Sequence, residues 1–207
     1  MLNRASSSVA AIPQPLSAID ALSVRLGPLI LATRRATRTP TTAAIGAAAD
    51  AVAELISTQP CRIPDSWLSP GPLSYRRFEL WRDPELDCQI LAMVWPVGAR
   101  TPIHDHGGAF GIEAVWAGEL SVTDFRVLES TRNAVRLGVS DTRRFSSGQL
   151  LTMQAPADLH LCRNPSQHGA TVSLHVYGRS QQRQTVYQQL EDDWYALQLK
   201  DLPTEVV

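Results

Sequence analysis

Residues 98–118 read Gly-Ala-Arg-Thr-Pro-Ile-His-Asp-His-Gly-Gly-Ala-Phe-Gly-Ile-Glu-Ala-Val-Trp-Ala-Gly. The apolar alternation from Ile112 to Trp116, bounded by glycines, favours a β-strand. Side chains two positions apart on a strand point to the same face. His104 and His106 would therefore offer two imidazoles side by side, the spacing that one metal ion needs. All 5 histidines lie between residues 104 and 175, which strengthens the prediction of a metal site.

The sequence around this stretch has the pattern of an all-β domain. From Cys61 onward, short apolar runs alternate with turn residues, and no helical pattern separates them. Many short strands at regular spacing are typical of an antiparallel sandwich or a small barrel. We expect strands at residues 75–81, 89–95, 101–106, 110–117, 120–127, 134–137, 149–153, 160–162, 172–177 and 185–190.

The first part of the chain carries two apolar stripes at helical spacing. They comprise Leu16, Ile19, Leu22 and Leu26, and then Ile45, Ala48, Val52, Leu55 and Ile56. Gly27-Pro28 would end the first helix, residues 34–42 would form a connection, and Pro60 would end the second helix. We predict a helical segment over residues 1–60, packed on a barrel domain over residues 61–207 that holds the metal site.

Composition narrows the possible partners. The chain has 19 basic and 20 acidic residues, so neither nucleic acid nor an anionic membrane is an expected partner. No apolar run approaches the ~20 residues of a membrane span, and no signal-peptide pattern precedes the first helix. The 3 cysteines are widely spaced and odd in number, which argues against a disulfide framework and favours the cytoplasm. We expect a monomer or a weak homo-oligomer.

The metal site needs a third ligand, because a metal inside a barrel takes ligands from more than one strand. His160 is the best candidate, since it follows the turn residues Gly148 and Pro156 and precedes Asn164. Three neutral imidazoles leave about three positions open on an octahedral ion, which suits Fe(II) and, less specifically, Mn, Co, Ni or Zn. The alternative is that His160 is an ordinary histidine at the end of the barrel, but the nearby His-x-His pair disfavours this interpretation.

These residues carry a resemblance to a known superfamily. The pattern Gly98-x5-His104-x-His106…Gly118 resembles the first cupin motif, and His160-x3-Asn164 resembles the second. The resemblance covers roughly residues 70–180. It implies a mainly β fold, a cupin jelly-roll barrel preceded by N-terminal α-helices.

One departure from the usual cupin motif indicates a particular family within the superfamily. Most metal cupins place a glutamate ligand four or five residues after the second histidine, where this chain has Phe110 and Gly111. In lacking this glutamate, the chain resembles the thiol dioxygenases, the cysteine dioxygenase family. Glu113 would share a strand face with Gly111, so whether it approaches the metal stays open. Mammalian members carry at the position of Gly111 a cysteine that cross-links to a tyrosine, so we predict no thioether here.

The segment Ser173-Leu-His175-Val-Tyr177 supports the same resemblance. On a strand, Ser173, His175 and Tyr177 share one face, so that hydroxyl, imidazole and phenol can hydrogen-bond in series. A Ser-His hydrolase is disfavoured because the chain has no nucleophile elbow. In thiol dioxygenases a Ser-x-His-x-Tyr strand lies beside a three-histidine iron. The resemblance therefore implies that Tyr177, His175 and Ser173 are catalytic residues.

A carboxylate anchor is expected one strand upstream. Tyr75 and Arg77 would share a face and Arg76 would take the other. They match the Tyr-x-Arg segment of the family, and a guanidinium can hold a carboxylate through two hydrogen bonds. The resemblance therefore implies that Arg77 and Tyr75 bind substrate, while Arg76 is expected on the surface. Relatives acting on 3-mercaptopropionate tend to carry glutamine, so arginine favours cysteine.

The resemblance implies an oxidoreductase that incorporates molecular oxygen. It would be a non-haem Fe(II) enzyme adding both atoms of O2 to the sulfur of a small carboxylated thiol, converting L-cysteine to cysteine sulfinic acid. The same chemistry on 3-mercaptopropionate or mercaptosuccinate is an alternative, with Arg76 or Arg163 as a second cation. A non-catalytic metal-binding cupin is another, whereas the empty glutamate position disfavours a cupin isomerase. Cys162 is expected to be a small buried residue.

Overall fold

The structure, a computed structural model, describes residues 25–69, 74–156 and 158–207. Within this part of the chain, helices α2 (Gly27–Arg38) and α3 (Thr42–Thr58) and a 3-10 helix (Asp65–Leu68) precede the strands. The strands are β1 (Arg76–Arg82), β2 (Gln89–Trp95), β3 (Ile103–His104), β4 (Gly111–Ala117), β5 (Glu119–Ser130), β6 (Val135–Ser146), β7 (Leu150–Met153), β8 (His160–Arg163), β9 (Thr171–Tyr177), β10 (Arg183–Glu191), β11 (Trp194–Asp201) and β12 (Glu205–Val206). The expectation of a mainly β fold preceded by helices is confirmed.

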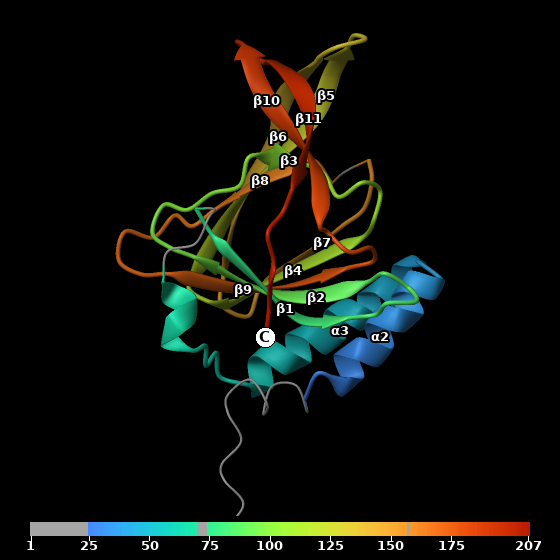
Figure 1. The fold of residues 1–207 in the computed structure, drawn as a ribbon, viewed down its shortest axis with the longest axis vertical. Coiled ribbons are helices and arrows are strands. Elements are labelled where there is room, and N and C mark those ends of the chain that lie inside the picture. The colour runs from blue at the N-terminus through green and yellow to red at the C-terminus, as the bar shows by residue number, and fades with distance from the viewer. Residues whose placement is uncertain (1–24, 70–73, 157) are drawn as a thin grey trace, which may run out of the picture.

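The strands form two sheets that face each other. One has 6 strands in the order β12-β1-β2-β9-β4-β7, and the other closes on itself in the order β10-β11-β6-β5-β8-β3. Figure 1 shows α2 and α3 beneath the first sheet, and the β5–β6 and β10–β11 hairpins extending away on the opposite side. The metal-site strands β3 and β8 belong to the second sheet, while β4 and β9 belong to the first.

The central strands of the first sheet are buried between the helices on one face and the inside of the barrel on the other. Every residue of β2 and β9 is buried. Ile90, Leu174 and Val176 pack into the core that also contains the helices. Their neighbours in the sequence, with the opposite strand parity, face the inside of the barrel. The polar residues of β9 therefore point inward because the outward positions are taken by the helix-facing core.

The two helices share that core with the sheet. Thr41 caps α3, its hydroxyl accepting a hydrogen bond from the backbone N–H of Ala44 at 3.2 Å. The indole N–H of Trp116 on β4 donates to the carbonyl of Gln59 at 2.9 Å, which ties the end of α3 to the sheet. No helix in the described part of the chain is both long and apolar enough to span a membrane.

Some predicted boundaries are wrong. Helix α2, which begins at Gly27-Pro28, was not expected; proline fits the first turn because the N–H that it lacks would have no partner within the helix there. Residues 34–38, expected in a connection, continue α2. The predicted helical residues 16–22 lie outside the described residues. In the sheets, β5 and β6 run to 12 residues each, and β11 and β12 were not expected. Their exposed, mixed-polarity residues hide the alternation that marks a strand.

The predicted strand over residues 101–106 is also too long. Strand β3 covers only Ile103–His104, so His106 lies in the following turn. Gly107 and Gly108 continue this turn with φ values of 61° and 81°, a conformation that glycine adopts readily. His106 therefore reaches the site from a turn and not from a strand position.

Candidate metal centre

The three predicted histidine ligands converge on one buried point. His104 on β3 and His160 on β8 lie directly opposite each other in the ladder. The ring centroids of His104, His106 and His160 are 4.6 to 5.2 Å apart. One nitrogen from each lies within 4.8 Å of the others, and all three side chains are buried. This is the donor set and spacing that one metal ion requires.

The unpaired ring nitrogens fit a bound metal. His104 Nδ1 lies 3.0 Å from the carbonyl oxygen of Pro102 and donates to it, which leaves the lone pair of Nε2 available. Among the described residues, both ring nitrogens of His106 and Nε2 of His160 have no hydrogen-bond partner. Buried polar atoms without partners are costly, and a metal would satisfy one nitrogen of His106 and Nε2 of His160.

The electrostatic surroundings keep these ligands neutral. Burial, reinforced by His160, lowers the pKa of His104 from its ordinary 6.5 to about 3. Burial likewise holds the pKa of His106 well below its ordinary value. Metal ligation needs the neutral imidazole, so the site favours the ligating form at neutral pH. The backbone N–H of His106 donates to the Asp158 carboxylate at 3.1 Å, which fixes the turn.

A chain of hydrogen bonds runs along the inner face of β9. The indole N–H of Trp95 donates to Ser173 Oγ at 2.7 Å, and Ser173 Oγ lies 2.7 Å from His175 Nε2. His175 Nδ1 lies 2.9 Å from the Tyr177 hydroxyl oxygen. Because Trp95 already donates to Ser173, the serine hydrogen is free to go to Nε2, and Nδ1 then carries the ring hydrogen. Burial raises the pKa of Tyr177 well above its ordinary value, so the phenol stays protonated.

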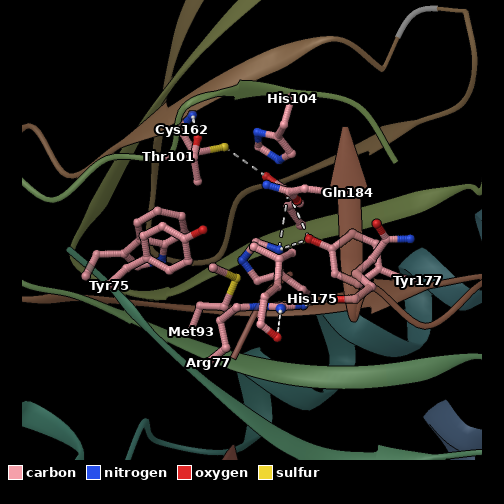
Figure 2. A pocket seen from close by; sticks show the side chains of 13 residues that line it. Tyr75, Arg77, Met93, Thr101, His104, Cys162, His175, Tyr177 and Gln184 are labelled. Atoms are coloured by element: carbon pink, nitrogen blue, oxygen red, sulfur yellow. Dashed lines mark hydrogen bonds and ion pairs between the residues drawn. The ribbon is translucent and has the colours of Figure 1, made fainter. Parts of the chain in front are cut away.

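Several of these residues line one small cavity between the two sheets. Figure 2 shows its side chains, with Tyr75 and Tyr177 on opposite sides, His104 above and Arg77 below. Its described lining consists of Tyr75, Arg77, Met93, Trp95, Thr101, His104, Glu113, Cys162, His175, Tyr177, Gln181, Gln184 and Leu202. One metal ligand, His175 and Tyr177 of β9, and the two expected substrate-binding residues therefore share one cavity.

Arg77 reaches the cavity from β1, whose alternation turns it inward. Its side chain is buried, and its guanidinium donates to the carbonyl of Gln181 at 2.7 Å and to that of Leu202 at 3.4 Å. These two bonds leave part of its five N–H donors free. Burial lowers the pKa of Arg77, although a guanidinium remains charged. The carbonyls of Gln181 and Leu202 were not anticipated from the sequence.

Arg76 and Arg163, the two candidates for a second cation, do not line this cavity. Arg76 takes the opposite face of β1, as expected, where it pairs with Glu205 and donates to the carbonyl of Ser66 at 2.6 Å. Arg163 is exposed. Neither belongs to the described lining, so a second cation for a dicarboxylic thiol does not come from these side chains.

Glu113 is the main residue of the site whose role the sequence left open. It is buried on the inner face of β4, directly opposite His175 in the ladder. Its Oε1 lies 3.2 Å from His175 Nδ1 and 3.7 Å from His160 Nε2. Its Oε2 accepts a hydrogen bond from the thiol of Cys162 at 3.4 Å, and Cys162 is itself buried. In the sequence, the indication that Glu113 could approach the metal was that it shares a strand face with Gly111.

Gly111 lies opposite Tyr177 in the same ladder. A Cβ placed on Gly111 would be 3.5 Å from Cε1 of the tyrosine ring. Since glycine has no side chain to form the bond, the absence of a thioether stays a prediction with a clear structural basis.

Solved structures similar to this chain include small cupins. A cupin domain of an XRE family transcriptional regulator from Enterobacter cloacae has 15% identity and a TM-score of 0.39, covering 50% of this chain and 95% of that one. A double-stranded β-helix protein from Klebsiella pneumoniae has 14% identity and a TM-score of 0.43, covering 60% of this chain and 88% of that one. At this level of similarity we draw no conclusion about this chain from them.

The comparison with protein families is more specific. The family model for cysteine dioxygenase type I matches residues 85–189, half of the chain. The match contains His104, His106, His160 and the polar residues of β9, and it indicates a dioxygenase-type enzyme that uses a thiol and O2 at a metal site. The resemblance seen in the sequence is confirmed: the chain belongs to the cysteine dioxygenase type I family.

Proposed function

We propose that this protein is a non-haem iron thiol dioxygenase that converts L-cysteine to cysteine sulfinic acid. Fe(II) would be held by His104, His106 and His160. The observation that carries the proposal is a buried three-histidine cluster beside a cavity that also contains the buried guanidinium of Arg77. This combination suits a ligand that has both a thiol and a carboxylate.

The charge of the donor set favours a thiolate. Three neutral imidazoles add no negative charge, so a divalent ion at this position would keep its full charge and attract an anionic sulfur. When bound, iron supplies the open coordination positions and the redox chemistry that unite thiolate and O2. A thiol and O2 give a sulfinate and a proton, so the reaction balances without an external reductant.

Arg77 would hold the substrate carboxylate. Its bonds to the carbonyls of Gln181 and Leu202 fix the guanidinium in advance, so little side-chain freedom is lost when a carboxylate binds. A guanidinium can grip both carboxylate oxygens, and burial strengthens the ion pair. Tyr75 lies beside it, stacked on Trp95 with ring centroids 4.9 Å apart, and forms part of the same wall.

Tyr177 would control a proton at the reacting sulfur and oxygen atoms. Its raised pKa keeps the hydroxyl hydrogen in place at neutral pH, so the phenol can donate a hydrogen bond into the cavity. His175 and Ser173 orient the tyrosine through the hydrogen-bond chain and would support catalysis from behind it.

We also propose the remaining organisation of the protein. Residues 1–60 would form a helical segment packed on a catalytic barrel of residues 61–207, since α2, α3 and the sheet share one core. Cys61, Cys88 and Cys162 are free thiols, which supports work in a reducing cytoplasm. The protein would act as a monomer or a weak homo-oligomer.

The test is oxygen uptake by the anaerobically iron-loaded protein. L-cysteine, 3-mercaptopropionate and mercaptosuccinate are supplied separately, and the sulfinate formed is measured. We expect uptake to match sulfinate one-to-one, with cysteine the fastest substrate. Faster turnover of another thiol would reassign the substrate. No uptake from any thiol, with one iron bound per chain, would favour a non-catalytic metal-binding cupin.

A further inference from the structure

We propose that Glu113 determines substrate specificity by accepting an N–H hydrogen bond from the α-amine of the thiol substrate. The inference rests on the proposed function and adds to it the residue that would distinguish an amino thiol from thiols without an amine. It arises from an acidic side chain buried in the cavity that the proposed reaction leaves without a task.

Among the described residues, the carboxylate of Glu113 has only long hydrogen-bond contacts. It lies 3.4 Å from the Tyr177 hydroxyl, 3.2 Å from His175 Nδ1 and 3.4 Å from the thiol of Cys162. Good hydrogen bonds to a carboxylate are about 2.5–2.9 Å long, and a thiol is a weak donor. The two oxygens therefore keep acceptor capacity toward the cavity.

The carboxylate also lacks a permanent counter-ion. Its ion-pair partners in the described part of the chain are His160 and His175, which are charged only when protonated. A buried carboxylate is costly unless a cation or strong donors compensate it.

The donor atoms place Glu113 beside the three-histidine cluster, not within it. The nitrogens of His104, His106 and His160 form one set of mutually close donors, and Glu113 belongs to a different set with His160 and Cys162. Glu113 also lines the cavity that contains Arg77, His104 and Tyr177. Its free acceptor capacity is therefore directed at a bound ligand.

The cavity consequently offers one cation and one anion that do not neutralise each other. Arg77 donates to backbone carbonyls, and within the described residues no ion pair joins it to Glu113. An α-amino carboxylate complements both groups, because its amine carries N–H donors whether it is protonated or bound to a metal. 3-Mercaptopropionate offers nothing to Glu113, and the second carboxylate of mercaptosuccinate would be repelled by it.

The test compares thiol binding to the wild-type protein and to Glu113→Gln, which removes the charge at nearly constant volume. The anaerobic Fe(II) protein is treated with nitric oxide and titrated with each thiol, and binding is followed by electron paramagnetic resonance. We expect the dissociation constant of cysteine to rise at least about tenfold, the loss of one charge-assisted hydrogen bond. That of 3-mercaptopropionate should change less than about twofold, and mercaptosuccinate should bind more tightly.

Controls separate charge from packing. Glu119→Gln makes the same chemical change on the outside of the barrel and should leave all three dissociation constants unchanged. Cys162→Ala alters the packing around Glu113 but keeps its charge, so the preference for cysteine should persist. If Glu113→Gln does not fold, Glu113→Leu removes the charge with an apolar side chain and should give the same loss of selectivity.

Three results would overturn the inference. Equal weakening of cysteine and 3-mercaptopropionate would indicate a structural role, and loss of iron from Glu113→Gln would make the residue a metal ligand. Failure of every thiol to bind the wild-type protein would also end it. If thiols bind with the expected selectivity but none is oxidised, the inference stands and the proposed dioxygenase function fails. If thiols are oxidised but Glu113→Gln does not change the selectivity, the proposed dioxygenase function stands and the inference about Glu113 fails.

Discussion

Replacing Arg77 by methionine tests how the cavity selects its ligand. Methionine retains an unbranched apolar stem but removes the guanidinium, which is buried and held by two backbone carbonyls. A carboxylated thiol would lose a buried, hydrogen-bonded ion pair, a change that costs about 2–5 kcal/mol. Since about 1.4 kcal/mol corresponds to a factor of ten, kcat/KM for cysteine should fall roughly 30- to 5,000-fold.

The same substitution has a predictable structural cost. The carbonyl of Gln181 loses a donor at 2.7 Å and stays buried, which should lower the free energy of unfolding by about 1–3 kcal/mol. A protein that remains folded at the assay temperature then separates the two effects. Urea denaturation measures the stability and steady-state kinetics measures the loss of binding.

Cysteamine provides the matched control, because it has the thiol and the amine of cysteine but no carboxylate. Its kcat/KM should change by less than about threefold in Arg77→Met, and bound iron should stay at the wild-type level. The reasoning would be refuted if cysteamine and cysteine lost activity equally. Loss of iron would also refute it, because Arg77 would then support the metal and not the carboxylate.

Three further predictions concern the metal ligands and the fold. His104→Ala should abolish iron binding, whereas His168→Ala, outside the cluster, should retain it. Elemental analysis measures the bound iron, and stoichiometric iron in His104→Ala would show that His104 is not a ligand. The metal-free protein should lose stability as the pH falls from about 6.5 toward 3, because His104 takes up a proton when unfolded but resists it when folded. A urea midpoint that is higher at pH 5 than at pH 7 would contradict this sign. Leu29→Ala, in the core that α2 shares with the sheet, should lower the free energy of unfolding by about 2–5 kcal/mol in a single transition; two separate transitions would show that the helices fold independently.

Strand parity explains why much of the site could be predicted from the sequence. Ser173, His175 and Tyr177 share a face of β9, and the three-residue hydrogen-bond chain follows directly from that placement. The same parity separates Arg77 from Arg76, and the resemblance to the family's Tyr-x-Arg segment then assigns Arg77 to the cavity, where it lies. These are local consequences of an extended backbone, so they need no knowledge of the tertiary structure.

The features that were missed depend on contacts between distant parts of the chain. The carbonyl that holds Arg77 belongs to Gln181, and the donor to Ser173 belongs to Trp95 on another strand. The acceptor capacity of Glu113 becomes visible only when its partners and their distances are known. Likewise, Gly27-Pro28 is compatible with either end of a helix, and the packing of Leu29 shows that it begins one.

The central claim is that both atoms of O2 reach the sulfur of a carboxylated thiol at this site. The most direct measurement uses the iron-loaded protein, L-cysteine and 18O2 in ordinary water, with mass spectrometry of the sulfinate. We expect the product to carry two heavy oxygen atoms, and the product of the parallel reaction with 16O2 in H2 18O to carry none. A sulfinate with a single heavy atom from 18O2, or with oxygen drawn from water, would contradict it.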